Sequence, residues 1–121
     1  MVVAAEDGID EISICSKTKI HELKNGKVNH YVLDPEKFNM KLANLNDIQV
    51  NTIEEAYVFG LDILNGKRGS GFDMVALNAG AALYTLGINN NLSDGINNAI
   101  NVLHSGKALL LLNKYAKFTN Q

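Results

Sequence analysis

The chain has 121 residues, a mass of 13.2 kDa and 46% hydrophobic residues, which suffices for one compact domain but not for two ordinary ones. Charged residues make up 20% and the formal net charge is −2, which argues against a disordered chain, and no apolar run approaches the roughly 18 to 20 residues of a membrane span. Eleven basic residues against thirteen acidic ones, with Arg68 as the only arginine, leave no basic patch for a nucleic acid.

Two short strands are predicted at the beginning of the chain. Residues 1–5 form an apolar stretch that no polar residues precede. We therefore expect the sheet to which this strand belongs to begin upstream, in sequence not present here. Residues 9–15 place Ile12 and Ile14 on one side of an extended segment, which predicts a second strand.

The clearest local signal is a β-hairpin. Residues 18–24 and 27–33 flank Asn25-Gly26, the pair that accepts positive φ at both centres of a type I′ turn. Counting outward from this two-residue loop pairs Leu23 with Val28, His21 with His30 and Ile20 with Tyr31.

Helices are predicted for the rest of the chain. Asp34 followed by Pro35 indicates a short helical turn over 35–40, and 41–51 reads as an irregular connection. A capping box at 52–55 starts a helix that ends at Asn65-Gly66. Its apolar stripe is expected to contain Ile53, Tyr57, Leu61 and Leu64.

Three further helices follow in the second half. The first, over 72–86, is apolar nearly all round and is expected to be buried. The next opens at 92–94 and turns Ile96, Ile100 and Leu103 inward, and a terminal helix over 107–118 contains four consecutive leucines that suggest packing on more than one side. Strands followed by helices would ordinarily be read as α+β.

The densest cluster of ionisable side chains in the sequence is acidic. Four carboxylates, those of Glu6, Asp7, Asp10 and Glu11, lie within six positions next to Gly8. Carboxylates at a strand end are hard oxygen ligands that suit Mg²⁺, and Asp10 and Glu11 are the candidate metal ligands. The alternative is a solvated acidic turn. Adjacent side chains of a strand point to opposite faces, so a shared ion would need a local bend.

Several other residues have both a chemical and a structural reading. His21 and His30 face each other and could approach a transition metal, but no local third ligand is present, which favours an exposed ribbon. His104 is read as the cap of a helix C-terminus. Cys15 has no partner for an internal disulfide and reads as a small buried residue; with no secretory signal, this predicts a reducing cytoplasm.

Two features of the helical half complete the candidates. Residues 66–71 superficially resemble a phosphate-binding loop but lack its residue order and follow a helix, so a surface loop is the better interpretation. Asn78 lies inside the apolar helix and, if buried, needs a hydrogen-bond partner, most simply a neighbouring backbone group.

Taken together, several motifs resemble anthranilate phosphoribosyltransferases. They are VVAAEDGIDEIS (2–13), YVLDPEKF (31–38), LNAGAALY (77–84) and SGKAL (105–109), and the resemblance spans essentially all 121 residues. It implies that residues 1–121 are the C-terminal fragment of an α/β catalytic domain of the nucleoside phosphorylase and phosphoribosyltransferase type, with a mixed sheet, a β-hairpin and flanking helices. The family usually has a histidine and a glycine where this chain has Ala4 and Ala5.

The resemblance also implies a function. The whole enzyme would transfer phosphoribose from phosphoribosyl pyrophosphate to anthranilate in tryptophan biosynthesis, and Asp10 and Glu11 match the acidic pair that holds Mg²⁺ against the diphosphate. The loop for phosphoribosyl pyrophosphate, the anthranilate-recognising residues and the helical dimerisation domain lie upstream in the family. The chain alone is therefore expected to be inactive, and the full-length protein is expected to be a homodimer.

Two alternatives remain open. One is a related nucleoside phosphorylase-type enzyme or a paralogue with another acceptor. The other is a non-enzymatic module that binds a divalent cation or a protein partner. Titration of Mg²⁺ with and without phosphoribosyl pyrophosphate distinguishes them, because the enzyme requires binding that strengthens when the diphosphate is present.

Overall fold

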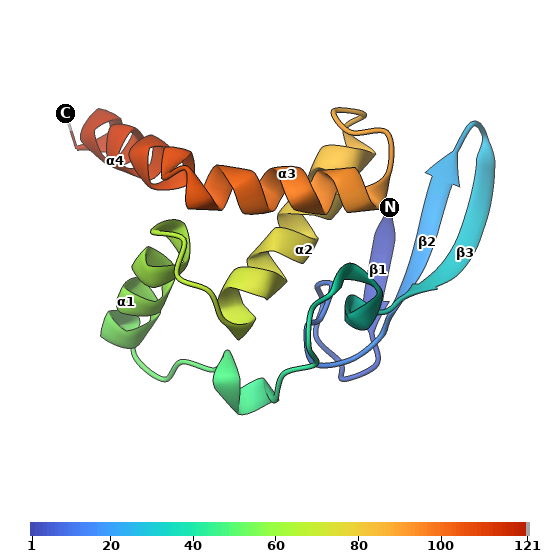
Figure 1. Cartoon of the computed structure of the whole chain (residues 1–121), viewed down its shortest axis with the longest axis horizontal. Coiled ribbons are helices and arrows are strands. Elements are labelled where there is room, and N and C mark those ends of the chain that lie inside the picture. Colours follow the sequence, from blue (N-terminus) through green and yellow to red (C-terminus); the bar gives the residue numbers. More distant parts are fainter. Residues whose placement is uncertain (121) are drawn as a thin grey trace.

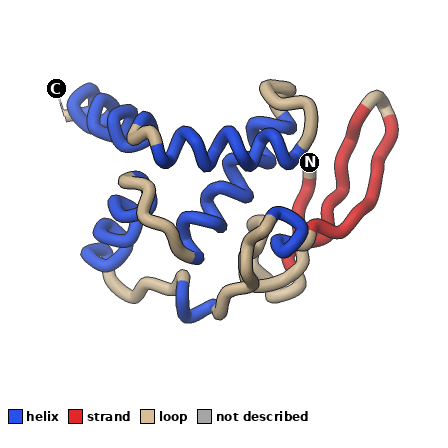
Figure 2. Tube along the Cα trace, in the orientation of Figure 1, coloured by secondary structure: helices blue, strands red, loops and turns tan. Residues whose placement is uncertain are grey.

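A computed structural model describes residues 1–120 and shows a small sheet beside a group of four helices (Figures 1 and 2). The helices lie together on one side, while the sheet and the loops that follow it lie on the other. None of the helices in this part of the chain has the length and apolar character needed to cross a membrane. In chain order the strands and helices are β1 (Val2–Ala5), β2 (Thr18–Lys24), β3 (Lys27–Leu33), the 3-10 helices η1 (Pro35–Phe38) and η2 (Leu45–Asp47), α1 (Ile53–Leu64), α2 (Ser70–Thr85), α3 (Leu92–His104) and α4 (Lys107–Thr119).

The sheet confirms the predicted hairpin in detail. β2 and β3 are antiparallel, with Leu23 opposite Val28, His21 opposite His30 and Ile20 opposite Tyr31. The turn residues Asn25 and Gly26 have φ values of 52° and 73°, as a type I′ turn requires. β1 pairs antiparallel with β2, so the sheet formed by residues 1–120 has the order β1-β2-β3 and is antiparallel, whereas a mixed sheet was expected.

The second predicted strand, over 9–15, is wrong. This segment is irregular, although both isoleucines that suggested a strand are buried: Ile12 is 1% exposed and Ile14 is fully buried. The alternation of apolar and polar residues arises here because a loop directs the side chains of Ile12 and Ile14 into the core. Several of its backbone groups bond to side chains in place of a neighbouring strand, as described below, and Ile14 O accepts from the backbone N–H of Ala43.

The helices begin and end near the expected positions. The side chain of Asp34 accepts a hydrogen bond from the backbone N–H of Glu36 at the start of η1, and the Thr52 hydroxyl accepts one from Glu55 at the start of α1. The Glu55 carboxylate accepts from Asn51 N–H, so only half of the predicted capping box forms.

Helices α2 and α3 pack most closely. A Cβ atom added to Gly80 of α2 would lie 2.5 Å from both the backbone nitrogen and the Cα of Ile96, and one added to Gly95 of α3 would lie 2.3 Å from the Gly80 carbonyl oxygen. Two glycines thus allow the helix backbones to approach each other. As predicted, Ile96 and Leu103 of α3 are buried, and Ile100 is half-buried.

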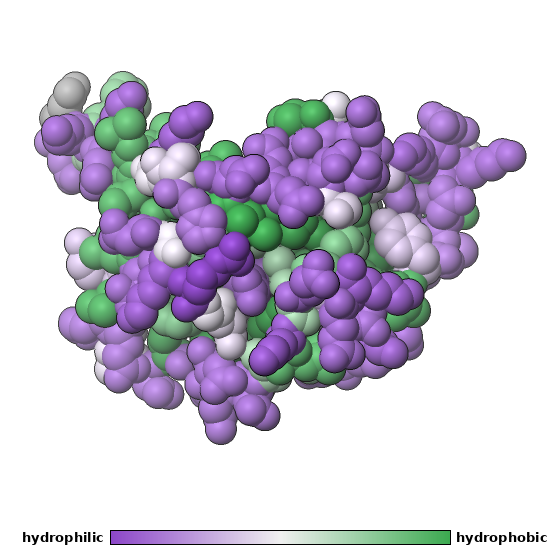
Figure 3. Space-filling model, in the orientation of Figure 1, coloured by the Kyte–Doolittle hydropathy of each residue, from purple (hydrophilic) through white to green (hydrophobic). Residues whose placement is uncertain are grey.

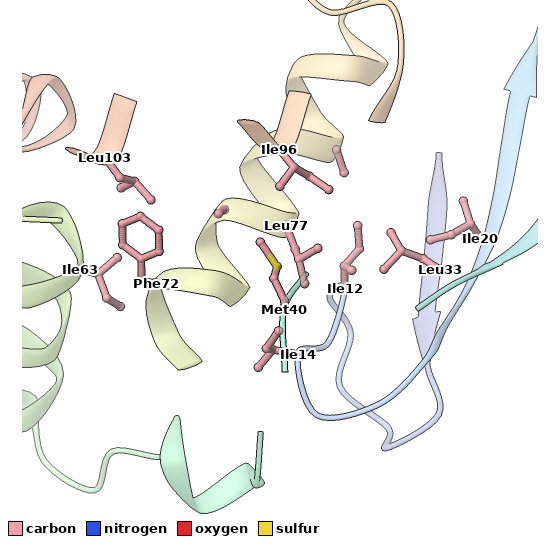
Figure 4. Packing of buried hydrophobic residues seen from close by; sticks show 12 residues of the cluster. Ile12, Ile14, Ile20, Leu33, Met40, Ile63, Phe72, Leu77, Ile96 and Leu103 are labelled. Carbon is pink, nitrogen blue, oxygen red and sulfur yellow. The ribbon is translucent and has the colours of Figure 1, made fainter. Parts of the chain in front are cut away.

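One apolar core joins the sheet side to the helices (Figure 4). Ile12 and Ile14 come from the irregular segment, Ile20 and Leu33 from the hairpin, and Leu77 and Ile96 from α2 and α3. Toward α1, the cluster continues through Phe72, Ile63 and Leu103. The core therefore ties the segment that contains the acidic residues directly to α2.

The stripe predicted for α1 is only partly covered, with Leu61 and Leu64 half-buried, and the packing on more than one side suggested for α4 is not found among residues 1–120. Ile53 and Tyr57 of the expected stripe on α1 are 84% and 64% exposed, and Ile63 is the buried residue of this helix. In α4 no residue is buried, and Leu111 and Phe118 are 67% and 74% exposed. Figure 3 shows apolar side chains at the surface in this part of the molecule. Residues 1–120 thus leave uncovered Ile53 and Tyr57 of the stripe and most of the leucine run.

Candidate functional site

The acidic segment leaves β1 through a tight turn that Asp7 organises. The Ser13 hydroxyl donates to Asp7 Oδ2 at 2.5 Å, Ile9 N–H donates to Asp7 Oδ1 at 3.2 Å, and Asp7 N–H donates to the Ser16 hydroxyl at 3.2 Å. Gly8 supplies the positive φ of 89° that the turn needs. Asp7 is thus a structural acid, whose role the sequence did not reveal.

The hydrogen bonds to Asp7 also change its acidity. Partial burial raises the pKa of the Asp7 carboxyl, but the bonds from Ser13, Ile9 and Ser16 stabilise the charged form more strongly and lower the pKa below its usual value. Asp7 is therefore a carboxylate engaged in holding the loop, and is a poor candidate for a metal ligand.

Asp10 and Glu11 have the opposite environment. Both side chains are exposed, the backbone bends at these two residues, and no described residue forms an ion pair with either carboxylate. The bend is the local feature that shared binding of one ion requires. Glu11 also lines a cavity of about 370 Å³, whose walls include Phe59 and Ile63 of α1 and Met74 of α2.

The chemistry of this pair limits the kind of metal it fits. Residues 1–120 contain no group of three or more histidine, cysteine or acidic side chains that could hold a metal ion. Asp10 and Glu11 alone therefore suit an ion that takes one or two carboxylates and completes its shell with water and phosphate oxygens, as Mg²⁺ does.

The backbone beyond the acidic pair is held by Asn78 of α2. Its Oδ1 accepts a hydrogen bond from Ile12 N–H at 3.0 Å, and its Nδ2 donates to Ile12 O at 2.8 Å and to Met74 O at 3.0 Å. The predicted backbone partner of Asn78 is confirmed. Met74 O is the neighbouring group that was expected. The second partner, Ile12, lies 66 residues away and directly after Glu11, and no local pattern predicts that contact.

Neighbouring polar groups complete the loop. Ser13 N–H donates to the buried Thr18 hydroxyl at 3.1 Å, and Cys15 N–H donates to the Ser13 hydroxyl at 2.9 Å. Cys15 is half-buried, and burial raises the pKa of its thiol. Every buried side-chain nitrogen or oxygen among residues 1–120 has a hydrogen-bond partner.

The other predicted candidates do not join the acidic pair. His21 and His30 lie on the exposed side of the hairpin with their Nδ1 atoms 3.2 Å apart and their rings 4.4 Å apart, edge to face. The described part of the chain brings no third ligand to them. His104 lies in the last turn of α3, as predicted, and its ring lies 5.0 Å from that of Phe72.

The glycine-rich loop at 66–71 connects α1 with α2. Lys67 pairs with Asp62 at 2.6 Å and Arg68 with Asp73 at 3.6 Å. Burial raises the pKa of Asp73, with Arg68 opposing the shift. Both basic side chains thus point to carboxylates of the adjoining helices, which fits the connecting loop that was predicted.

A polar network at the tip of the hairpin was not predicted. Tyr84 of α2 donates to Glu22 Oε1 at 2.6 Å and accepts from Lys24 Nζ at 2.7 Å, while Tyr31 donates to Glu22 Oε2 at 3.1 Å. Burial and the nearby Glu22 raise the pKa of Tyr31 far above its usual value. Tyr84 and Glu22 are 62 residues apart in the sequence, so no local sequence pattern predicts this contact.

Comparison with known proteins assigns the class. The family described as "Glycosyl transferase family, a/b domain" matches residues 1–109, and the chain belongs to this family. Its strand-poor fold is therefore a portion of that α/β domain.

Individual relatives make the assignment narrower. The anthranilate phosphoribosyltransferase of Ruthia magnifica is 42% identical over 117 residues, which are 97% of this chain and 34% of that protein. The crystal structure of the Thermus thermophilus anthranilate phosphoribosyltransferase superposes with a TM-score of 0.88 at 35% identity, over 99% of this chain and 35% of the other. A variant of the Saccharomyces cerevisiae enzyme with Mg bound has a TM-score of 0.77 at 25% identity, over 92% and 33%. This chain is thus homologous to anthranilate phosphoribosyltransferases over nearly its whole length, and it spans about a third of the length of the curated relatives it matches.

Proposed function

We propose that this chain forms part of an anthranilate phosphoribosyltransferase, which transfers phosphoribose from phosphoribosyl pyrophosphate to the amino group of anthranilate and releases pyrophosphate. One observation supports this most directly: the exposed, unpaired acidic pair Asp10 and Glu11 lies in a chain homologous to these enzymes, one of which has been solved with Mg bound.

The proposed task of the two carboxylates is to bind Mg²⁺ together with the diphosphate. When bound, the ion offsets negative charge that grows on the leaving pyrophosphate as the ribosyl carbon becomes cation-like. Asp10 and Glu11 would hold and orient it, while Asp7 stays committed to the turn through its bonds to Ser13 and Ile9. Acid–base chemistry and recognition of anthranilate are not assigned to residues of this chain.

We further propose that residues 1–121 are the C-terminal portion of the catalytic domain. The exposed apolar side chains of α1 and α4 are consistent with cover by the remainder of such a domain, in which the antiparallel sheet seen here would join a larger mixed sheet. Dimerisation through a helical domain also belongs to the complete protein.

A chimera tests the proposed function. The matching third of the Thermus thermophilus relative is replaced by this chain, and loss of anthranilate is followed in the presence of phosphoribosyl pyrophosphate and Mg²⁺. We expect turnover by the chimera, none by the 121-residue chain alone, and strong loss when Asp10→Asn and Glu11→Gln are introduced together. Glu6→Gln, which neutralises another exposed acid of the same segment, is the control and should retain turnover.

The chimera also separates the alternatives. A folded chimera that consumes a different acceptor in place of anthranilate would favour a related transferase or phosphorylase. The proposal would be contradicted by a folded chimera that transfers no phosphoribose and binds Mg²⁺ equally well with and without the diphosphate. That result would favour a cation-binding module.

A further inference from the structure

Asp10 and Glu11 lie in an irregular segment that lacks the ladder of a sheet, yet a metal site needs its ligands held in place before the ion arrives. The segment is anchored on both sides of the pair. On one side, Asp7 binds Ile9 N–H and the Ser13 hydroxyl. On the other side, the backbone of Ile12 bonds to the Asn78 side chain of α2, and two residues further on Ile14 O accepts a hydrogen bond from Ala43 N–H at 3.1 Å.

Asn78 bonds to both peptide groups of Ile12. The N–H that Oδ1 accepts belongs to the peptide group joining Glu11 to Ile12, and the carbonyl that Nδ2 contacts belongs to the next peptide group. Fixing two successive peptide planes fixes the backbone direction at Glu11. The Ile12 side chain, 1% exposed in the core, prevents the same residue from sliding along α2.

Only an amide fits this position. Its oxygen faces an N–H donor, while its nitrogen faces the carbonyl oxygens of Ile12 and Met74. An aspartate of the same shape would still accept from Ile12 N–H but would place a second carboxylate oxygen against two carbonyl oxygens. The bond to Met74, one turn earlier in α2, also holds the amide in the orientation that meets Ile12.

We propose that Asn78 is a positioning residue whose carboxamide locks the backbone of Ile12 to α2 and so holds Asp10 and Glu11 ready for a metal-bound diphosphate. This inference rests on the proposed function, because it assigns Asn78 a purpose only if the acidic pair binds the ion. Asn78 touches neither ion nor substrate in this account and acts through the Glu11–Ile12 backbone.

The test uses Mn²⁺ as a paramagnetic probe that binds oxygen ligands, added together with pyrophosphate to the 121-residue chain while backbone amide signals are followed by NMR. Selective broadening around residues 9–13, lost in the Asp10→Asn, Glu11→Gln double variant, marks the site. Removing a partner that orients a metal ligand commonly weakens affinity about 10-fold to 100-fold, and we expect at least roughly 10-fold for Asn78→Asp. The control is Asn98→Asp, the same change at a half-buried asparagine of α3 that bonds only to Asn89.

A second readout does not depend on the ion. Hydrogen exchange of the Ile12 amide should be slow in the unsubstituted chain and should accelerate in Asn78→Asp and Asn78→Leu, while amides at the α2–α3 crossing stay protected. Fast exchange of Ile12 in the unsubstituted chain overturns the proposal even if both variants fail to fold. Equal Mn²⁺ affinity in folded Asn78→Asp and in the unsubstituted chain also overturns it. Absence of Mn²⁺ binding by the unsubstituted chain in the presence of pyrophosphate instead overturns the metal assignment, and with it the purpose given to Asn78, whereas slow Ile12 exchange would still show the anchor.

Discussion

The α2–α3 pair and the α1–α4 pair contain similarly apolar residues but use them differently. Where α2 crosses α3, glycines bring the backbones together, and Leu77 and Ile96 are almost completely buried. In α4 a run of leucines leaves no residue buried. An apolar pattern therefore specifies which face of a helix can be covered, whereas close backbone approach determines which face is covered within this chain. The acidic segment is attached to the well-packed part, through Ile12 and Asn78.

The largest contrast should come from two glycines. Gly80→Ala would force a Cβ against the backbone of Ile96, at 2.5 Å, and should cost about 3 kcal/mol or more of unfolding free energy by overpacking. Gly60→Ala in α1, where no described atom outside the adjacent residues and local helix backbone lies within 4 Å of the added Cβ, should stabilise by about 0.5–1 kcal/mol. Urea denaturation followed by circular dichroism measures both, and equal effects would show that the two regions are packed alike.

Leucines of the two regions should differ nearly as much. Leu103→Ala empties a site that is 4% exposed and should cost about 2–5 kcal/mol. Leu111→Ala, at a site that is 67% exposed, should change stability by no more than about 0.5 kcal/mol. Thermal unfolding of the two variants checks this, and a large loss at Leu111 would mean that α4 is covered in solution.

A smaller effect is expected from the hairpin network. Tyr84→Phe removes the hydroxyl that bonds to Glu22 and Lys24 and should cost about 1 kcal/mol. Tyr115→Phe, the same change on exposed α4, should be nearly neutral. The pair is compared by denaturant midpoint, and a neutral Tyr84→Phe would show that the network adds nothing to the packing of the hairpin on α2.

The smallest effect is a pH dependence at the turn. Because the pKa of Asp7 is lower in the folded state than its ordinary value of 3.8, its contribution to stability is present above pH 4 and is lost as the pH falls through the folded-state pKa. The difference in stability between the unsubstituted chain and Asp7→Asn should therefore shrink in acid. Asp73, whose pKa burial raises, should show the opposite sign. Unfolding midpoints between pH 6 and pH 2.5 test this, and a constant difference for Asp7→Asn would contradict it.

Local chemistry explains which parts of the fold could be predicted. The hairpin register follows from Asn25-Gly26, because a two-residue turn leaves a single way to count the pairs. The starts of η1 and α1 follow from Asp34 and Thr52, whose side chains bond within three residues. Each of these signals acts over a few positions, which is why a single sequence contains it.

The errors share a different cause. The strand expected at 9–15 fails because Ile12 alternates with polar residues for a tertiary reason: Asn78 replaces the neighbouring strand as its hydrogen-bond partner. The stripe of α1 is only half right, because Ile53 and Tyr57 are exposed in residues 1–120 while Leu61 and Leu64 are half-buried. For the proposed site, the acidic cluster and the resemblance pointed to Asp10 and Glu11 as candidates, and the anchoring of their segment by Asp7 and Asn78 became visible only in three dimensions.

The central claim is that Asp10 and Glu11 bind Mg²⁺ beneath a sugar diphosphate. Calorimetric titration of Mg²⁺ into the chimera, with and without phosphoribosyl pyrophosphate, tests it most directly. We predict tighter Mg²⁺ binding when the diphosphate is present, an enhancement that Asp10→Asn with Glu11→Gln removes and Glu6→Gln leaves intact. Equal Mg²⁺ affinity with and without the diphosphate, or an enhancement that survives loss of both carboxylates, would contradict the claim.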